Sequence, residues 1–414
     1  MQRLKMDLEY LADVLGKLLK TPSPTGFTDE IVQVTGKELE RLGIPFELTR
    51  RGAIRAHLPG HLHHPDRAIV VHLDTIGAMV KELKSNGRLG LMPIGQWSSR
   101  FAEGARATLY TDDNCFRGTI LPLKASGHTY DAEVDSQPVN WDQVELRIDT
   151  ILKSDRDLER LGINVGDYVA IDPQPEFLDN GFIVSRHLDN KAGVAALLTA
   201  AKAIRESGMD LPVDTHLLFT ISEETGSGAS AVLHRGASEL VTIDNGTVAP
   251  GQYSRESGVT LAMMDSSGPF DFHLTHKLIN ICKTFEIQYQ RDVFRYYRCD
   301  SASAVEAGND TRTALICFGV DGSHGYERTH LNALRSIAEL TTLYLQSEPT
   351  FMKDKADLSK FSDFSKQVDT FMEHKNSGEL GFAEGDDIRI TGSIEPDSEE
   401  WGRVVGGDRH QPKR

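Results

Sequence analysis

The 414-residue chain has few cysteines, no long apolar run and no cluster of basic residues. Its cysteines form no CxxC pair, so we expect neither a disulfide framework nor a structural zinc site, and a cytoplasmic location suits them. Charges interrupt the apolar positions of the first twenty residues, which argues against a secretory signal. No stretch is apolar enough to span a membrane, so no membrane partner is expected. The cysteines are Cys115, Cys282, Cys299 and Cys317.

The charge balance is acidic, with 61 Asp and Glu against 45 Lys and Arg and a net charge of −16. Binding to phosphates needs clustered Lys and Arg, so the sequence predicts no nucleic-acid partner. Only three tryptophans are present, which disfavours a sugar-binding cleft.

The sequence pattern changes three times along the chain. Residues 1–80 read as helices followed by strands, and residues 181–350 alternate strands with helices, which is typical of an α/β domain. Residues 81–180 hold short alternating segments broken by Gly, Pro, Asn and Asp, which predicts a small inserted β domain. Residues 351–414 are polar and acidic with little periodicity, which predicts a flexible tail.

Ionisable side chains follow the apolar strands. His72 and Asp74 end the run RAIVVHLDT, and because side chains alternate along a strand they point to the same side. The carboxyl ends of strands form the ligand crevice of an open α/β sheet, so these groups should meet at one edge. The other strand-end residues are Asp189, Glu223, Glu224, Asp244 and His324.

Each of these residues also has an ordinary explanation. Asp189 before a helix can be an N-cap, and Asp244 before Asn-Gly can belong to a plain turn. Their recurrence at one strand end after another indicates a metal site, because burying several carboxylates together costs free energy unless cations compensate their charge. Two histidines and three carboxylates suit zinc, cobalt or manganese. Five ligands exceed the need of one catalytic zinc, so we expect two divalent ions sharing one carboxylate.

Five segments in order, HLDTIG, RHLDNKAGV, SEETGSGAS, TIDNG and GSHGYE, resemble the motifs of the cytoplasmic dinuclear metallo-aminopeptidases. This family includes glutamyl aminopeptidase and the tetrahedral TET-type enzymes, and the resemblance covers residues 5–345. The segment CDSASA at 299–304 is similar to the family's TDA-type stretch. The chain is also similar to the branch associated with a dipeptide-like osmoprotectant.

The resemblance implies a fold and an assembly. The fold would be a zinc-peptidase-like α/β/α sandwich with a mixed sheet, interrupted by a small β domain. In the family this inserted domain contributes to dimers that assemble into dodecamers, so self-association is expected.

The resemblance also implies the metal ligands. His72 and Glu224 would complete the first metal site, Asp244 and His324 the second, and Asp189 would bridge both. The last motif is one residue shorter than the family pattern and lacks its proline. His330 is therefore a competing ligand; we favour His324 because a ligand belongs at the strand end.

Two further roles follow from the same resemblance. Glu223 would be the general base that takes a proton from water and delivers it to the leaving amine. The carboxylate of Asp74 would accept the second imidazole N–H of His72 and fix its tautomer. Glu223 and Glu224 can both face the site only if their strand ends before them, and ETGSG predicts that break.

The predicted function is a metal-dependent aminopeptidase acting on short peptides, with a nearby acid receiving the free amino terminus. A deacylase or amidohydrolase of N-acyl amino acids or dipeptides could use the same site, and a non-catalytic scaffold is a third interpretation. A glycosidase is disfavoured because adjacent Glu223 and Glu224 are too close to flank a sugar. Three arginines could bind an acidic substrate, although arginines at such spacing are more commonly surface charge. They are Arg291, Arg295 and Arg298.

Overall fold

The computed structural model describes residues 1–233 and 236–350. The tail expected at residues 351–414 lies outside the described residues. No described helix is long and apolar enough to cross a membrane, and the four cysteines are free.

A mixed sheet of twelve strands forms the centre of the described α/β domain, in the order β1-β2-β12-β3-β13-β17-β18-β11-β10, with β14, β15 and β16 attached through β17. Its first members are β1 (Phe46–Leu48), β2 (Ile54–Leu58), β3 (Gly60–His72), β10 (Glu176–Phe177), β11 (Phe182–Ser185) and β12 (Leu211–Thr220). The later members are β13 (Ala237–Val248), β14 (Val259–Asp265), β15 (Gly268–Pro269), β16 (Tyr289–Val293), β17 (Arg312–Asp321) and β18 (Glu327–His330).

Four neighbouring strands, β12, β3, β13 and β17, run parallel. The apolar run of β3 is buried because β12 and β13 pair with its two edges and helices cover the faces of the sheet. Parallel pairing sets Thr220 beside His72 and Asp244 beside Cys317. The carboxyl ends of these strands therefore lie at the same edge of the sheet.

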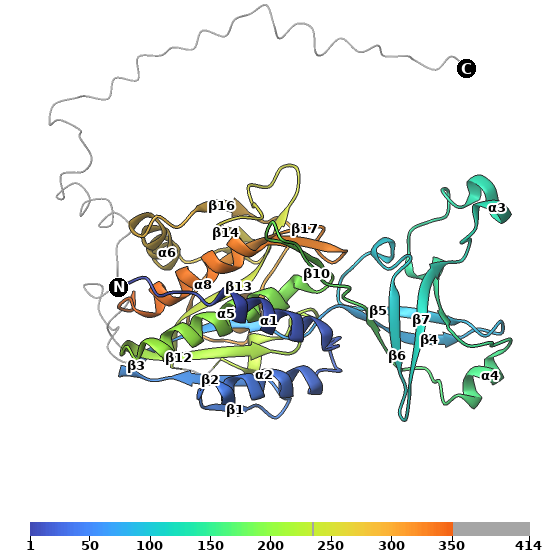
Figure 1. The fold of residues 1–414 in the computed structure, drawn as a ribbon, viewed down its shortest axis with the longest axis horizontal. Helices are drawn as coiled ribbons and strands as arrows, with labels where there is room; N and C mark the ends of the chain where they lie inside the picture. Colours follow the sequence, from blue (N-terminus) through green and yellow to red (C-terminus); the bar gives the residue numbers. More distant parts are fainter. Residues whose placement is uncertain (234–235, 351–414) are drawn as a thin grey trace, which may run out of the picture. The chain divides into compact units, whose positions relative to one another are not determined.

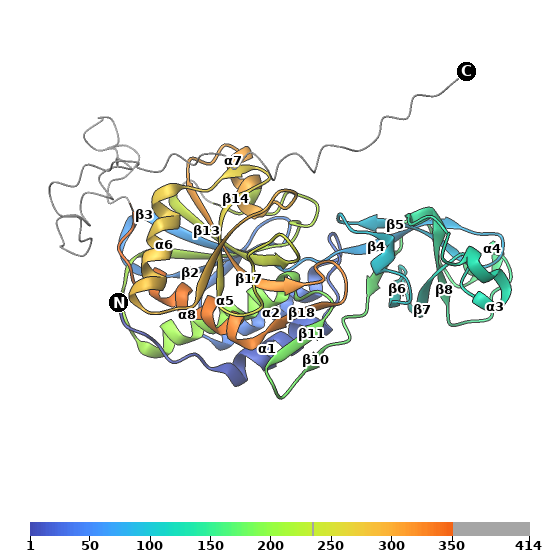
Figure 2. The ribbon, with the colours of Figure 1, turned by 90° about the horizontal axis from the view of Figure 1, so that it is seen from above.

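Helices cover the sheet, and Figure 2 shows α1, α5 and α8 along one side and α7 on the other. This confirms the expected sandwich with a mixed sheet. The helices are α1 (Leu8–Lys20), α2 (Asp29–Arg41), α3 (Gly127–Tyr130), α4 (Asp155–Arg160), α5 (Leu188–Ser207), α6 (Phe272–Thr284), α7 (Asp300–Glu306) and α8 (Leu331–Leu345).

Helix α5 is the most deeply buried of these helices along its length, as nearly every residue from Leu188 to Ile204 is buried. Its alanines allow close packing against β3 and β13 on one side and against α1 and α8 on the other. It ends at Gly208, whose left-handed φ of 64° suits a residue without a side chain. The helix thereby holds its first turn firmly against the strand ends.

The inserted β domain is a closed six-stranded barrel in the order β4-β5-β8-β7-β6-β9 (Figure 1). Its core includes Leu91, Leu109, Leu146 and Val169, and the indole N–H of Trp97 donates to the Gly77 carbonyl at 3.0 Å. The barrel strands run from residue 77 to residue 171, whereas the sequence composition predicted an inserted domain at residues 81–180. They are β4 (Gly77–Leu83), β5 (Leu89–Ile94), β6 (Arg106–Tyr110), β7 (Cys115–Pro122), β8 (Val144–Ile148) and β9 (Tyr168–Ile171).

Arg67 on β3 is a fully buried cation at the amino-terminal side of the parallel strands. Its guanidinium donates to the carbonyls of Tyr344 at 2.6 Å and Ser347 at 2.8 Å, and stacks 4.7 Å from the Tyr344 ring. Its Nε lies 4.0 Å from Glu239, whose carboxylate accepts the Tyr344 hydroxyl at 2.6 Å. Arg67 therefore ties the end of α8 to the sheet.

Replacing Arg67 by leucine should lower the free energy of unfolding by about 3 kcal/mol, because the substitution leaves the buried Glu239 carboxylate without its guanidinium neighbour. Urea unfolding followed by circular dichroism measures this as a lower midpoint. The exposed Arg160→Leu should leave the midpoint unchanged. Equal midpoints for the Arg67 variant and the wild type would contradict this account.

Candidate metal centre and active site

The ionisable residues singled out in the sequence meet at the carboxyl edge of the parallel strands. His72 ends β3, Glu223 and Glu224 follow the end of β12 at Thr220, and His324 follows β17. The strand break expected before the glutamate pair is thus present. Asp244 instead lies inside β13, which continues to Val248, so it does not end a strand as expected.

Asp189 occupies the first turn of α5, where the backbone departs from helical angles and His187 takes the N-cap position. Its Oδ1 lies 3.1 Å from His72 Nε2, and its Oδ2 lies 3.4 Å from His324 Nε2. Its carboxylate also accepts a hydrogen bond from the Asn245 side chain at 2.6 Å. The side chain therefore bridges two imidazoles and is not a helix cap.

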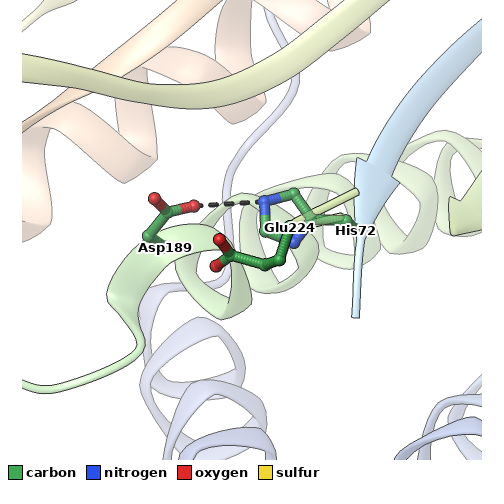
Figure 3. A group of neighbouring side chains, drawn as sticks. All are labelled: His72, Asp189 and Glu224. Atoms are coloured by element: carbon green, nitrogen blue, oxygen red, sulfur yellow. Dashed lines mark hydrogen bonds and ion pairs between the residues drawn. The ribbon is translucent and has the colours of Figure 1, made fainter. Parts of the chain in front are cut away.

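His72 is buried and faces three carboxylates. Besides Asp189, its Nε2 lies 3.8 Å from an oxygen of Asp244 and 3.8 Å from an oxygen of Glu223. Figure 3 shows the His72 and Asp189 side chains pointing toward each other, with Glu224 beside them. One ligand atom from each of these three residues lies within 4.8 Å of the others, a spacing that could hold a metal ion.

The expected contact between the His72 imidazole and the Asp74 carboxylate is replaced by a closer one. Nδ1 lies 2.9 Å from the backbone carbonyl of Asp74, whereas the nearest carboxylate oxygen is 3.8 Å away. The strand ends at His72, and the backbone carbonyl two residues on is the nearer acceptor for the ring. Nδ1 therefore donates to a carbonyl oxygen, which fixes the same tautomer that was expected from the side chain.

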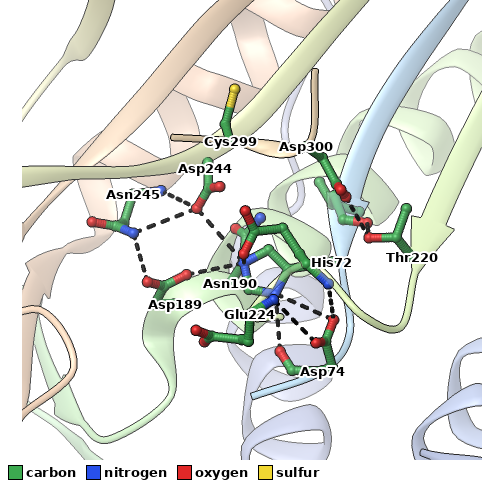
Figure 4. Close-up of polar contacts among 12 residues, drawn as sticks. His72, Asp74, Asp189, Asn190, Thr220, Glu224, Asp244, Asn245, Cys299 and Asp300 are labelled. Atoms are coloured by element: carbon green, nitrogen blue, oxygen red, sulfur yellow. Dashed lines mark hydrogen bonds and ion pairs between the residues drawn. The ribbon is translucent and has the colours of Figure 1, made fainter. Parts of the chain in front are cut away.

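The Asp74 carboxylate has a different task. It accepts the backbone N–H groups of Glu223 at 3.1 Å and Glu224 at 3.3 Å, and the hydroxyl of Thr25 at 2.6 Å. Figure 4 shows Asp74 next to His72 and Glu224. Asp74 thus organises the turn after β12 that carries both glutamates.

His324 faces the other oxygen of the Asp189 carboxylate. Its Nε2 also lies 3.4 Å from Glu224, and its Nδ1 lies 2.9 Å from the carbonyl of Gln96 in the segment that follows β5. Its backbone has a φ of 62°, which non-glycine residues seldom adopt and which is frequent at functional sites.

His330, the competing ligand, lies elsewhere. Its side chain accepts the N–H of Asn332 at 3.0 Å as the N-cap of α8, and its Nε2 lies 3.0 Å from the Asn180 carbonyl. It stacks edge-on against Phe182. The structure therefore brings His324, and not His330, to the carboxylate cluster.

The shortest contacts pair the ligands differently from the expected grouping. His72 faces Oδ1 of Asp189 and lies 3.8 Å from Asp244, while His324 faces Oδ2 and lies 3.4 Å from Glu224. Ligand atoms of His72, Asp189 and Glu224 nevertheless also lie within 4.8 Å of one another. The sequence-based grouping placed Glu224 with His72 and Asp244 with His324. Chain order gives no indication of which carboxylate faces which imidazole, because this depends on side-chain rotamers.

Two buried acids that the sequence analysis gave no role support the centre. Glu327 accepts the N–H of His324 at 2.9 Å and that of Asp189 at 3.1 Å. Asp300, in the CDSASA segment, accepts the Thr220 hydroxyl at 2.5 Å and the Ala229 N–H at 2.7 Å. The sequence signals were a carboxylate soon after the last histidine motif and the resemblance of CDSASA to a family stretch.

The crowding of acids perturbs their protonation. Burial raises the pKa of Glu224 to about 8, with His324 opposing and Asp189 reinforcing the shift. Burial likewise raises the pKa of Glu223 well above its usual range. Burial alone would lower the pKa of His324, but the carboxylates of Glu224 and Asp189 raise it to about 11. The centre holds more acid than two imidazoles can neutralise, which favours a bound cation.

One oxygen of the cluster has no partner within the described chain. Glu224 Oε1 is buried without a hydrogen bond, although buried carboxylate oxygens are normally satisfied. An orphan carboxylate oxygen beside an imidazole and a second carboxylate is the donor set that divalent zinc, cobalt or manganese accepts. The residues therefore fit a metal centre.

The centre lies in the wall of a cavity of about 960 Å³. Arg295 and Arg298 also line this cavity, whereas Arg291 lies on β16 outside it. Arg298 pairs with Glu306 at 2.7 Å, and the Arg295 guanidinium lies 5.3 Å from the Tyr296 ring. The three arginines thus do not form a single basic pocket.

Comparison with known proteins now identifies the family and the fold. Residues 52–340 match the model of the M42 glutamyl aminopeptidase family. The chain belongs to the M42 family. It is 35% identical over 336 residues to YhfE of Bacillus subtilis, which carries the name of an aminopeptidase, and the match covers 81% of this chain and 97% of that protein.

Solved structures of M42-type peptidases share the fold. A TET aminopeptidase from a marine sediment Thaumarchaeota archaeon superposes with a TM-score of 0.74 at 17% identity, covering 81% of this chain and 96% of that one. The TET1 peptidase of Pyrococcus horikoshii, which assembles into a tetrahedron or a large octahedral shell, gives 0.72 at 19% identity, covering 82% and 100%. M42 peptidases are metal-dependent, and the His/Asp/Glu group described here offers the ligands.

Divalent cations should raise the melting temperature of the metal-free protein, because they neutralise the buried carboxylates of the folded state and do not find this site in the unfolded chain. A concentration of Zn²⁺ or Co²⁺ one hundred times the dissociation constant corresponds to about 2.7 kcal/mol of stabilisation. Differential scanning fluorimetry measures the shift.

Asp189→Asn should abolish most of this shift, whereas the exposed Asp179→Asn should retain it. An undiminished shift in the Asp189 variant would place the bound cation elsewhere.

Proposed function

We propose that the chain is a dinuclear metallo-aminopeptidase that removes the amino-terminal residue of short peptides. The observation that carries this proposal is the position of Asp189, whose two oxygens face different imidazoles. The His72 imidazole also has Asp244 and Glu223 beside it, and the His324 imidazole has Glu224. A shared carboxylate between two such groups is suited to two ions.

The contacts support one assignment of the ligands. His72 and Asp244 would hold one ion, His324 and Glu224 the other, and Asp189 would bridge them. Zinc or cobalt suits these ligands, and manganese is also compatible. When bound, the pair supplies a strongly acidified water and polarises the scissile carbonyl.

Glu223 is proposed as the general base. Its carboxylate lines the cavity and approaches to 3.8 Å of His72 Nε2. It would accept the proton of the attacking water and return it to the amine that leaves. Its backbone N–H is held by Asp74, so its position depends on a carboxylate that touches no substrate.

A second candidate function is favoured by the composition of the cavity wall. The acids that line it within the described chain are Asp189, Glu223, Glu224 and Asp244. All four already have roles, so no separate acid is there to receive a free amino terminus. An amidohydrolase that acts on N-acyl amino acids would not need one, because these substrates have no free amino terminus.

The proposal includes a cytoplasmic location and self-association, as the family resemblance implies. Exposed apolar side chains on the barrel, Ile151 with 88% and Val165 with 64% of their surface accessible, would suit contacts between copies. The tetrahedral assembly of the TET1 peptidase gives a precedent for the fold.

The wild-type protein should release amino-terminal residues from di- to tetrapeptides, lose this activity on chelation and regain it with Zn²⁺ or Co²⁺. Amino-acid release measured by chromatography gives the rates. Matched N-acetylated peptides should be poor substrates. Preference for the acetylated series would favour the amidohydrolase, and a metal-loaded protein inactive on both series would support a non-catalytic scaffold.

Glu223→Gln should lower kcat by roughly 10²- to 10⁴-fold, because the amide cannot accept the water proton. Metal content, measured by inductively coupled plasma mass spectrometry, should stay at two ions per chain. The exposed Glu159→Gln serves as the control and should keep full activity. A Glu223 variant that retains wild-type turnover would exclude this residue as the base.

A further inference from the structure

Three buried polar atoms in the wall of the cavity have no hydrogen-bond partner within the described chain. They are Oε1 of Glu224, Oδ1 of Asn245 and the hydroxyl of Tyr297. A buried polar group without a partner costs about 1–3 kcal/mol. Orphan groups that gather in one cavity therefore point to a ligand that satisfies them.

The three atoms differ in whether they can accept or donate a hydrogen bond. Glu224 Oε1 belongs to a proposed metal ligand. Asn245 donates through Nδ2 to Asp189 at 2.6 Å and to Asp244 at 3.4 Å, so its Oδ1 must be the acceptor. The Tyr297 hydroxyl is the orphan that can donate a hydrogen bond. A phenol has an ordinary pKa of about 10 and keeps its proton at neutral pH.

The structure fixes the position of this hydroxyl. Tyr297 lies between β16 and α7, and its carbonyl accepts the N–H of Ser266 at 2.9 Å. Its ring packs edge-on against Phe294, with ring centres 5.2 Å apart. Phe294 is itself buried in a small core with Leu315 and Cys317 of the neighbouring strand β17. A donor held in this way needs little reorganisation when charge develops in front of it.

We propose that Tyr297 is a catalytic residue that donates a hydrogen bond to the carbonyl oxygen of the scissile amide. This role rests on the proposed hydrolytic function. When the water oxygen bonds to the carbonyl carbon, the π pair of the C=O bond moves onto the carbonyl oxygen. The water proton goes to Glu223, while Tyr297 keeps its own proton and stabilises the new negative charge.

The role predicts a defined kinetic signature. A hydrogen bond that strengthens as the oxygen becomes charged favours the transition state over the bound substrate. Its removal should therefore lower kcat and leave KM nearly unchanged. A residue that only shapes the cavity would instead change KM, metal content or stability.

The test compares metal-loaded wild type with Tyr297→Phe, which removes a single oxygen, and with Tyr253→Phe as control. Tyr253 is 72% exposed and does not line the cavity. Tyr297→Phe should lower kcat about 10- to 100-fold, with wild-type metal content and an unchanged or slightly raised melting temperature. The control should match the wild type.

Binding of a tetrahedral analogue gives a second readout. A phosphinic peptide should bind Tyr297→Phe more weakly by the same factor as kcat/KM falls, while the product amino acid binds equally well. Wild-type kcat in an active Tyr297→Phe protein would overturn the tyrosine role alone, as would an equal loss of analogue and product binding. An inactive, metal-loaded wild type would overturn the proposed function and the tyrosine role together.

Discussion

The buried carboxylate of Asp189, held between the imidazole that ends β3 and the one that follows β17, is the interaction on which the rest of the centre depends. It stands where α5 begins, and α5 is locked between the sheet and two other helices. Parallel strands on either side bring His72 and His324 to its two oxygens. Without this carboxylate the two imidazoles would lack a common partner, and the remaining acids would repel each other at close range.

Backbone amides, as well as side chains, hold the centre in place. Asp74 accepts the N–H groups of the two glutamates after β12, and Glu327 accepts those of Asp189 and His324. Each of these acids thus fixes the start of two functional side chains at once. A ligand positioned through its own peptide group has less freedom to drift from productive geometry, which is what a catalytic constellation requires.

The sequence revealed the strands, the interruption by a β domain and the five ligand candidates, because apolar runs that end in acids or histidine leave a plain pattern. The sequence did not predict the contacts that depend on local backbone geometry and on side-chain rotamers. The backbone carbonyl of Asp74 lies nearer to the His72 ring than its carboxylate does, which the alternation of side chains could not predict. The continuation of β13 past Asp244 to Val248 places this carboxylate inside a strand and not at its end. The pairing of carboxylates with imidazoles depends on side-chain direction, which the sequence does not give. Tyr297 follows no periodic pattern, and only the buried, unpartnered state of its hydroxyl reveals it.

The hydrogen-bonding distance between His324 and the carbonyl of Gln96 connects the barrel to the carboxylate cluster. Gln96 directly precedes Trp97, whose indole is anchored in the barrel core. The inserted domain thus sets the tautomer of an imidazole that belongs to the peptidase sheet. Loss of the insertion would remove this acceptor from His324, so the geometry of the carboxylate cluster depends on the barrel as well as on the sheet.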